Sequence, residues 1–235
     1  MPKKTIMRYK TILFTALFFT MLIAQNDTTD YFKNGLTNSI STKNNQIVLV
    51  AGLIGTGIAL KYDNSINSYA QSHVLMSDPI AMFGDYWGIG GQVLLWGAIL
   101  SSGNKSEKFR YASSAFVVNG LLTYGLKYGV KRERPDESNK RSFPSGHTSN
   151  SFLTASIVQE IYGSKAGIPA YLLAWVTGLS RIHDNKHYLS DVIFGAAMGT
   201  AIGQGFGKVY RNNQIPRIGI IHLNQNLKIN IVWAF

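Results

Sequence analysis

Apolar residues gather in six segments of helical length in the middle of the chain. These segments cover residues 47–60, 86–101, 111–127, 145–162, 167–182 and 188–207. Gly, Ala, Leu and Trp dominate them, and the alternation of apolar and polar positions that marks a strand is weak in all six. The pattern therefore predicts an all-α protein whose core is a bundle of six helices.

The last of these segments carries a glycine at every fourth position. Gly195, Gly199, Gly203 and Gly207 fall on one face of a helix, where they let a neighbouring helix approach closely. In a water-exposed helix each glycine would cost about 0.5–1 kcal/mol relative to alanine. We interpret the stripe as a packing face in a membrane bundle, and tight packing in a soluble bundle is the alternative.

The two ends of the chain differ from this core. Basic residues between positions 3 and 10 precede an uncharged stretch at 11–24, which predicts a signal peptide at residues 1–24 or a short membrane anchor. The polar residues 25–46 are expected to form a loop, and residues 47–210 the helical domain. The tail, residues 211–235, alternates better and predicts a β-hairpin or an extended arm.

Whether the helices span a bilayer is open from the sequence. Their charge-free stretches run to about 15–19 residues, at or below the roughly 20 that a span needs. If all six cross, Lys105, Lys108, Arg110, Lys165 and the basic tail share one side, which the positive-inside rule makes cytoplasmic. Residues 25–46 then lie on that side too, whereas a cleaved signal peptide would leave them outside.

Composition narrows the classes of function. Hydrophobic residues make up 46% and charged residues 15%, with a mean hydropathy of +0.02, which disfavours a disordered chain or a coiled coil. The absence of cysteine excludes disulfides, thiolate metal sites and a cysteine nucleophile. The net charge of +11 predicts an anionic partner or substrate, such as nucleic acid, anionic lipid or a phosphate ester.

Three short stretches hold most of the unusual polar residues, and the second of them opens a predicted helix. Ser145, Gly146 and His147 lie at that N-terminus, where free backbone N–H groups and the helix dipole attract an anion. Pro144 restricts the residue before it and so keeps the helix from beginning earlier. This stretch is therefore a candidate anion site.

Three cations stand at the ends of apolar segments in the same region. Lys127, Arg134 and Arg181 are costly near a membrane or a core unless an anion pairs with them. The planar fork of arginine suits two-point contact with phosphoryl oxygens, and lysine supplies a point charge. Taken alone, such a cluster is more often a solvated face.

Two histidines complete the constellation. His187 and Asp191 are four residues apart, so on a helix the carboxylate can accept the proton of one ring nitrogen and leave the other free to attack or to act as a base. His147 is suited to protonate a leaving oxygen. Two histidines, three cations and a helix N-terminus indicate phosphoryl transfer through a covalent intermediate.

The order and spacing of these residues resemble a known family. The motifs are Lys127-x6-Arg134-Pro135, Pro144-Ser145-Gly146-His147 and Ser180-Arg181-x5-His187-x3-Asp191. They resemble those of the type 2 phosphatidic acid phosphatase and vanadium haloperoxidase superfamily, without substitution, and the resemblance covers about residues 47–207 of the chain.

The resemblance implies a role for each position and a metal-independent reaction. It makes His187 the nucleophile, Asp191 its orienting partner, and His147 the general acid and later the base. The residues that it implies for binding the phosphoryl oxygens are Lys127, Arg134, Ser145, Gly146 and Arg181. No cofactor or metal is expected, in agreement with the lack of a carboxylate cluster in the sequence.

We therefore expect a bacterial cell-envelope phosphatase that hydrolyses a lipid phosphate or lipid pyrophosphate, either membrane-embedded with a periplasmic site or periplasmic. The alternatives are a soluble periplasmic acid phosphatase for small phosphomonoesters, a vanadium-dependent haloperoxidase, and a non-enzymatic envelope protein that retains the fold. Nucleic acid is not expected as a partner, because the basic run at 131–134 lies within the first motif.

Overall fold

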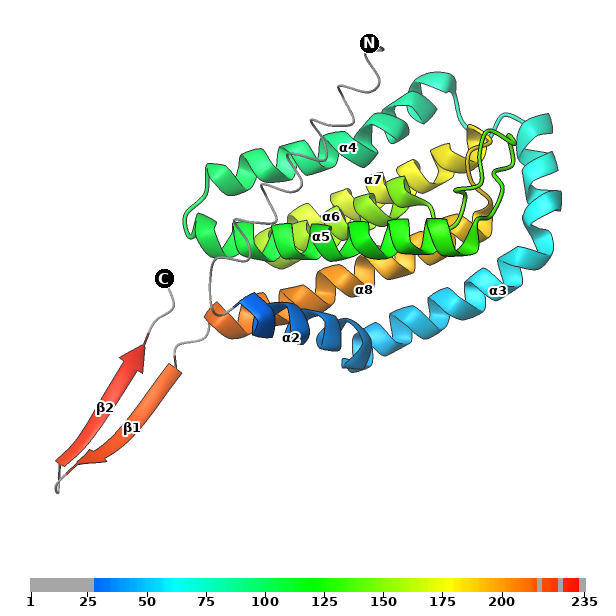
Figure 1. The fold of residues 1–235 in the computed structure, drawn as a ribbon. Helices are drawn as coiled ribbons and strands as arrows, with labels where there is room; N and C mark the ends of the chain where they lie inside the picture. Colours follow the sequence, from blue (N-terminus) through cyan, green and yellow to red (C-terminus); the bar gives the residue numbers. More distant parts are fainter. Residues whose placement is uncertain (1–27, 215–216, 224–225, 233–235) are drawn as a thin grey trace, which may run out of the picture.

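The computed structural model describes residues 28–214, 217–223 and 226–232 of the chain (Figure 1). Seven helices lie within these residues: α2 (Thr28–Ser41), α3 (Lys43–Ser72), α4 (Asp78–Leu100), α5 (Lys105–Val130), α6 (Gly146–Tyr162), α7 (Ser164–His183) and α8 (Leu189–Gln214). Two strands, β1 (Arg217–Leu223) and β2 (Asn226–Val232), pair antiparallel with Arg217 opposite Val232. The predicted signal peptide, residues 1–24, lies outside the described residues.

The six apolar segments correspond one to one to helices α3 to α8. α3 is much longer than its apolar segment, because Thr42 caps its first turn by accepting a bond from the N–H of Asn45, and the polar residues beyond Leu60 continue the helix to Ser72. The predicted helical core is confirmed. The predicted count of six is not, since the described residues hold seven helices.

The additional helix, α2, corrects the expectation that residues 25–46 form a loop. Tyr31, Gly35 and Ser39 recur at four-residue spacing, and this face packs on α8. Tyr31 is buried, and a Cβ atom at Gly35 would lie 2.4 Å from the ring of Phe206. Because glycine and serine form most of this face, an apolar stripe is hardly visible in the sequence, although the face is well packed.

Helices α6 and α8 form the centre of the bundle, with α3, α4, α5 and α7 around them (Figure 1). The glycine stripe of α8 packs closely against a neighbouring helix, as predicted, and that helix is α6. A Cβ atom at Gly199 would lie 2.1 Å from the carbonyl oxygen of Ser149, and one at Gly203 would lie 2.5 Å from the side chain of Ser156. Small residues thus bring the two central helices into backbone contact.

The outer helices reverse the pattern of a water-soluble bundle. α4 buries Ala81 and three glycines (84, 88 and 91) in its contacts with the core, and Leu95 and Ile99 near its end, whereas most of its other large apolar side chains face outward. Exposed apolar residues on α3, α4, α5 and α7 include Leu53, Ile54, Phe83, Val93, Leu121 and Leu172. Among the described residues, α3 is the one helix long and apolar enough to cross a membrane by length and composition.

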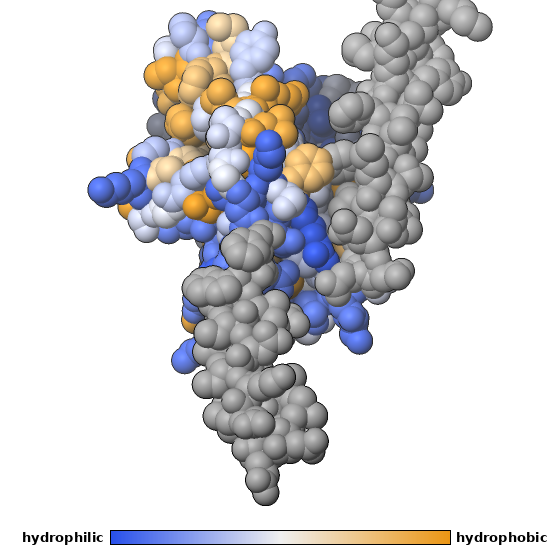
Figure 2. Space-filling model, turned by 90° about the vertical axis from the view of Figure 1, so that its left-hand side faces the viewer, coloured by the Kyte–Doolittle hydropathy of each residue, from blue (hydrophilic) through white to orange (hydrophobic). Residues whose placement is uncertain are grey.

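The two ends of the bundle differ in chemistry. At one end, α5 and α7 end while α4, α6 and α8 begin (Figure 1). At the other end, Lys105, Lys108 and Lys165 begin helices α5 and α7, and α2 packs beside the end of α8. Figure 2 looks onto this second end, where hydrophobic residues gather on the side of α4 and hydrophilic residues towards α2 and α8. We call it the basic end.

Candidate active site

A cavity of about 350 Å³ opens at the end of the bundle opposite the basic end. Five of the eight predicted site residues line it: Lys127, Arg134, Gly146, His147 and His187. The other three, Ser145, Arg181 and Asp191, are buried around it. The bundle brings these residues together because α5 ends, and α6 and α8 begin, at the same level.

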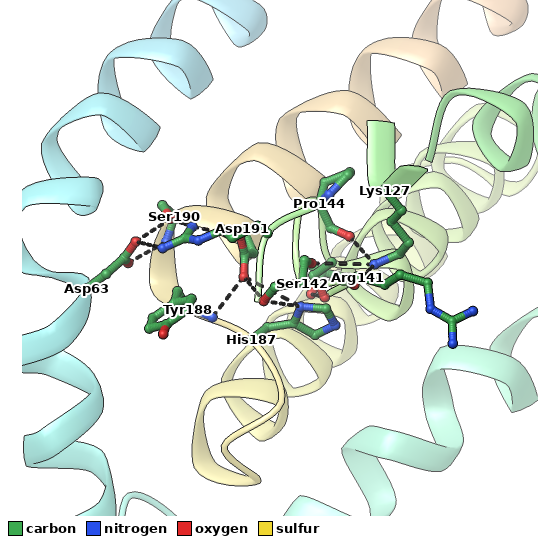
Figure 3. A network of polar contacts seen from close by, with 12 residues as sticks. Asp63, Lys127, Arg141, Ser142, Pro144, His187, Tyr188, Ser190 and Asp191 are labelled. Carbon is green, nitrogen blue, oxygen red and sulfur yellow. Dashed lines mark hydrogen bonds and ion pairs between the residues drawn. The ribbon is translucent and has the colours of Figure 1, made fainter. Parts of the chain in front are cut away.

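His187 lies between the cavity and a buried carboxylate (Figure 3). Its ring is 2% exposed, and its Nδ1 is 3.6 Å from Oδ2 of Asp191 and 3.5 Å from the hydroxyl of Ser142. The backbone N–H of Tyr188 donates to the same Oδ2 at 3.0 Å. With Nδ1 directed at the carboxylate, Nε2 is the nitrogen available to a reacting group.

The surroundings of His187 keep its ring neutral. Burial lowers the pKa of His187 to about 4; Asp191 raises this pKa, whereas the positive charges of Lys127 and Arg134 lower it further. A neutral imidazole has a free lone pair, so at neutral pH His187 is in the form that a nucleophile requires.

His147 faces the cavity from the first turn of α6 and meets a carboxylate that the sequence analysis did not single out. Its Nε2 lies 3.4 Å from Oδ1 of Asp85 on α4, and Nη1 of Arg181 lies 2.7 Å from the same oxygen. Arg181 also pairs with Asp184 at the end of α7. Gly88 makes room for this cluster, since a Cβ atom there would lie 2.8 Å from the His147 ring.

Lys127, expected to bind phosphoryl oxygens, also binds the loop between α5 and α6. Its ammonium group donates to the carbonyl oxygens of Arg141 at 2.7 Å, Ser142 at 3.4 Å and Pro144 at 2.6 Å (Figure 3). The side chain therefore holds its positive charge at the wall of the cavity while it fixes the loop that leads into Ser145.

Arg134 also lines the cavity, and its guanidinium has fewer hydrogen-bond partners than the ammonium group of Lys127. Within the described residues its Nε has no hydrogen-bond partner, and burial lowers the pKa of its guanidinium from the usual value. A partly buried guanidinium without a full set of partners is suited to bind two oxygens of a phosphoryl group.

Ser145 and Gly146 differ in their access to the cavity. Ser145 is fully buried; its hydroxyl lies 2.9 Å from that of Thr148, and its N–H donates to the carbonyl oxygen of Asp191 at 3.0 Å. Gly146 begins α6 and lines the cavity. The N-terminus of α6, with its free N–H groups, therefore borders the cavity, where the sequence predicts an anion site.

Four residues near the site were missed by the sequence analysis: Asp63, Asp85, Arg132 and Ser142. Asp63 and Asp85 lie just outside the apolar segments 47–60 and 86–101, and Asp63 is surrounded by polar residues, so their charges did not distinguish them in the sequence. Arg132 and Ser142 lie in the intervals between motif positions, where spacing carries no information about what a side chain contacts.

Comparisons with known proteins identify a family and several relatives. Residues 109–215 match the PAP2 superfamily. The chain is 34% identical over 146 residues to a lipid A 1-phosphatase of Porphyromonas gingivalis, covering 61% of this chain and 30% of that protein. It is 29% identical over 115 residues to a lipid A 4'-phosphatase of Helicobacter pylori, covering 43% and 56%. The matched parts thus span between about a third and a little over half of these two relatives.

A third relative is matched over more of its length, and two solved structures share the fold. The chain is 31% identical over 135 residues to a decaprenylphosphoryl-5-phosphoribose phosphatase of Mycobacterium tuberculosis, covering 53% of this chain and 73% of that protein. A transmembrane PAP2-type phosphatidylglycerolphosphate phosphatase of Bacillus subtilis aligns with a TM-score of 0.54 at 21% identity, over 75% and 96% of the two chains. LpxE of Aquifex aeolicus aligns with a TM-score of 0.50 at 21% identity, over 65% and 94%.

Proposed function

Because the chain belongs to the PAP2 superfamily, we propose that it is a phosphoric ester hydrolase that acts on a lipid phosphate or lipid pyrophosphate of the bacterial envelope through a phosphohistidine intermediate. The observation that carries the proposal is the shared cavity, in which the two histidines face Lys127 and Arg134. The three named relatives are phosphatases of lipid-linked substrates, which supports the same class of substrate here.

In the first step, His187 displaces the alcohol from phosphorus. Its Nε2 forms the P–N bond as the bond to the leaving oxygen breaks, and His147 gives that oxygen a proton. Asp191, at 3.6 Å from Nδ1, stabilises the positive charge that develops on the ring. Lys127, Arg134 and the N–H groups at the start of α6 stabilise the charge on the equatorial oxygens.

In the second step, water hydrolyses the phosphohistidine. His147, now neutral, takes a proton from the attacking water, the P–N bond breaks, and the electron pair returns to Nε2 of His187. Inorganic phosphate then dissociates, and the enzyme is back in its starting state. Asp85, which contacts both His147 and Arg181, lies close enough to influence the proton on His147.

The outer surface of the bundle supports a lipid substrate over a small soluble ester. The cavity wall includes Ile89 of α4 and Tyr124 of α5, both exposed, so its rim continues into the apolar surface of these helices. An alkyl chain can lie along that surface while the phosphate reaches the cations. A soluble acid phosphatase would have to leave the same surface in water.

The basic end supports an orientation in the membrane. Lys and Arg residues also lie at the cavity end, but most of them line the site or pair within it, as Lys127, Arg132 and Lys186 do. Lysines 105, 108 and 165 do not, and under the positive-inside rule they support a cytoplasmic location for their own end, with the cavity on the outer side and α2 on the inner side. This orientation favours a retained anchor over a cleaved signal peptide at residues 1–24, since α2 then lies on the cytoplasmic side.

Phosphate release by the detergent-purified protein tests the proposed function. We expect hydrolysis of p-nitrophenyl phosphate and faster hydrolysis of a lipid phosphate in mixed micelles, with inhibition by vanadate and none by EDTA. Protein that releases phosphate from neither class of ester, while it remains folded, would contradict the proposal. Halide oxidation after the addition of vanadate would instead favour the haloperoxidase alternative.

A further inference from the structure

Arg132 joins two buried carboxylates that come from different parts of the chain. Its Nη1 lies 2.8 Å from Oδ1 of Asp191 at the start of α8, and its Nη2 lies 2.7 Å from Oδ2 of Asp63 on α3. Asp63 is 3% exposed and Asp191 is fully buried. The guanidinium also lies over the ring of Tyr188, with Cζ 4.1 Å from the ring centroid.

Asp63 is also bound directly to α8, through Ser190 (Figure 3). Its Oδ1 accepts the backbone N–H of Ser190 at 3.0 Å, and its Oδ2 accepts the hydroxyl of the same residue. A carboxylate of α3 therefore satisfies a free N–H in the first turn of α8, one residue before Asp191.

The two carboxylate oxygens of Asp191 have different partners. Oδ1 accepts from Arg132, whereas Oδ2 accepts from the Ser142 hydroxyl and the Tyr188 N–H and faces Nδ1 of His187. A carboxylate held by one oxygen alone can rotate about its bond to Cβ. Arg132 prevents this rotation and keeps Oδ2 directed at the histidine.

We infer that Arg132 and Asp63 are positioning residues for the nucleophile: Asp63 on α3 orients Arg132, and Arg132 orients the carboxylate behind His187. The inference rests on the proposed function and extends it to residues that the three motifs do not specify. Arg132 occupies an unspecified position of the first motif, and Asp63 precedes the region matched by the superfamily. Neither side chain lines the cavity, so we assign neither of them a catalytic role.

The two residues act on His187 in opposite electrostatic senses. The charged groups that face His187 are Asp191 from α8, Lys127 from α5 and Arg134 from the loop between α5 and α6. Loss of the Arg132 charge leaves Asp191 less neutralised, which stabilises protonated His187. Loss of the Asp63 charge leaves Arg132 to neutralise Asp191 more fully, which disfavours protonated His187.

The test compares the pH profiles of kcat/KM for p-nitrophenyl phosphate in the full-length, detergent-purified protein. We expect Arg132→Gln to lower kcat by about 10- to 100-fold with KM within about threefold, and to move the acid limb to higher pH. Asp63→Asn should lower kcat less and move the acid limb to lower pH. Arg132→Lys retains the positive charge between the two buried carboxylates, so we expect this variant to fold. A single ammonium group cannot hold both carboxylates in place, so kcat should fall while the acid limb of the pH profile moves little.

A matched control is the ion pair of Lys186 with Asp136, which joins the loop between α7 and α8 to the loop between α5 and α6 at 2.6 Å without contact to Asp191. Asp136→Asn should leave the pH profile unchanged. Shifts of opposite sign in Arg132→Gln and Asp63→Asn support the inference. Profiles that stay in place, or move together, overturn it while the proposed function stands. A wild-type protein inactive on every phosphate ester would instead remove the proposed function.

Discussion

The ammonium group of Lys127 lies 2.6 Å from the carbonyl oxygen of Pro144, and it donates to two further carbonyls of the same loop. The side chain that contributes positive charge to the cavity therefore also holds the loop that leads into α6. A single side chain links the stability of the loop to the charge of the site.

Replacement of Lys127 should for this reason damage stability and activity together. In Lys127→Met, buried carbonyl oxygens lose their donor, at a cost of about 1–3 kcal/mol. We expect a lower Tm in detergent and activity below one hundredth of that of the wild type.

Arg134→Met is the matched comparison for Lys127→Met. The Arg134 guanidinium faces the same cavity, and its Nε has no hydrogen-bond partner within the described residues. This variant should lose activity with little change in Tm. A Lys127→Met protein as stable as Arg134→Met would contradict the fastening role of the lysine.

The neutral state of His187 gives folding a pH dependence. Its pKa is about 4 in the folded protein against 6.5 for the free side chain, so the unfolded chain binds the proton more readily between these values. Stability should therefore rise with pH from about 4 to 6.5. Thermal unfolding across this range measures the slope.

His187→Asn removes the titrating group and should flatten this part of the stability profile. The comparison is made on the difference between the two proteins, since other groups titrate in the same range. An identical slope in both would show that the His187 pKa is not lowered on folding.

The contact between α6 and α8 leaves no space for a side chain on the glycine stripe. A Cβ atom at Gly199 would lie 2.1 Å from a backbone oxygen, so Gly199→Ala should destabilise the protein by about 1–3 kcal/mol. At Gly97, on the outer face of α4, a Cβ atom would have no other atom within 4 Å. Gly97→Ala should be neutral or stabilising by up to about 1 kcal/mol. Equal effects at both positions would argue against close packing.

The absence of native cysteines makes the orientation testable by single-cysteine labelling. Val74 is 84% exposed at the cavity end, between α3 and α4, and Lys105 is exposed at the basic end. In intact cells, a membrane-impermeant maleimide should label the Val74→Cys variant and spare the Lys105→Cys variant until the membrane is permeabilised. The reverse pattern would place the cavity in the cytoplasm.

The sequence predicted the core helices and the motif residues for a common reason: both depend on local spacing. Apolar runs of helical length predicted α3 to α8, and the motif intervals located His147 and His187 at one end of the bundle. The spacing of a motif also reflects the requirement that its side chains meet on one substrate, so the motif can be recognised in the sequence.

What the sequence did not predict depends on contacts between distant segments. α2 packs through Gly35 and Ser39, which form no apolar stripe. Arg132 and Asp63 are 69 positions apart, and only the packing of α3 beside the start of α8 makes them a pair. Lys127 could be assigned a charge from its motif, but its bonds to the loop carbonyls follow from the path of residues 131–145.

The central claim is that His187 carries the phosphoryl group during turnover, and a trapping experiment tests it most directly. Protein mixed with a ³²P-labelled phosphate ester is quenched in alkaline denaturant, under which phosphohistidine survives, and the labelled peptide is mapped. We predict label on His187, with more in the His147→Ala variant because the second step lacks its base. Turnover with no label at His187, or with label at another residue, would contradict the account.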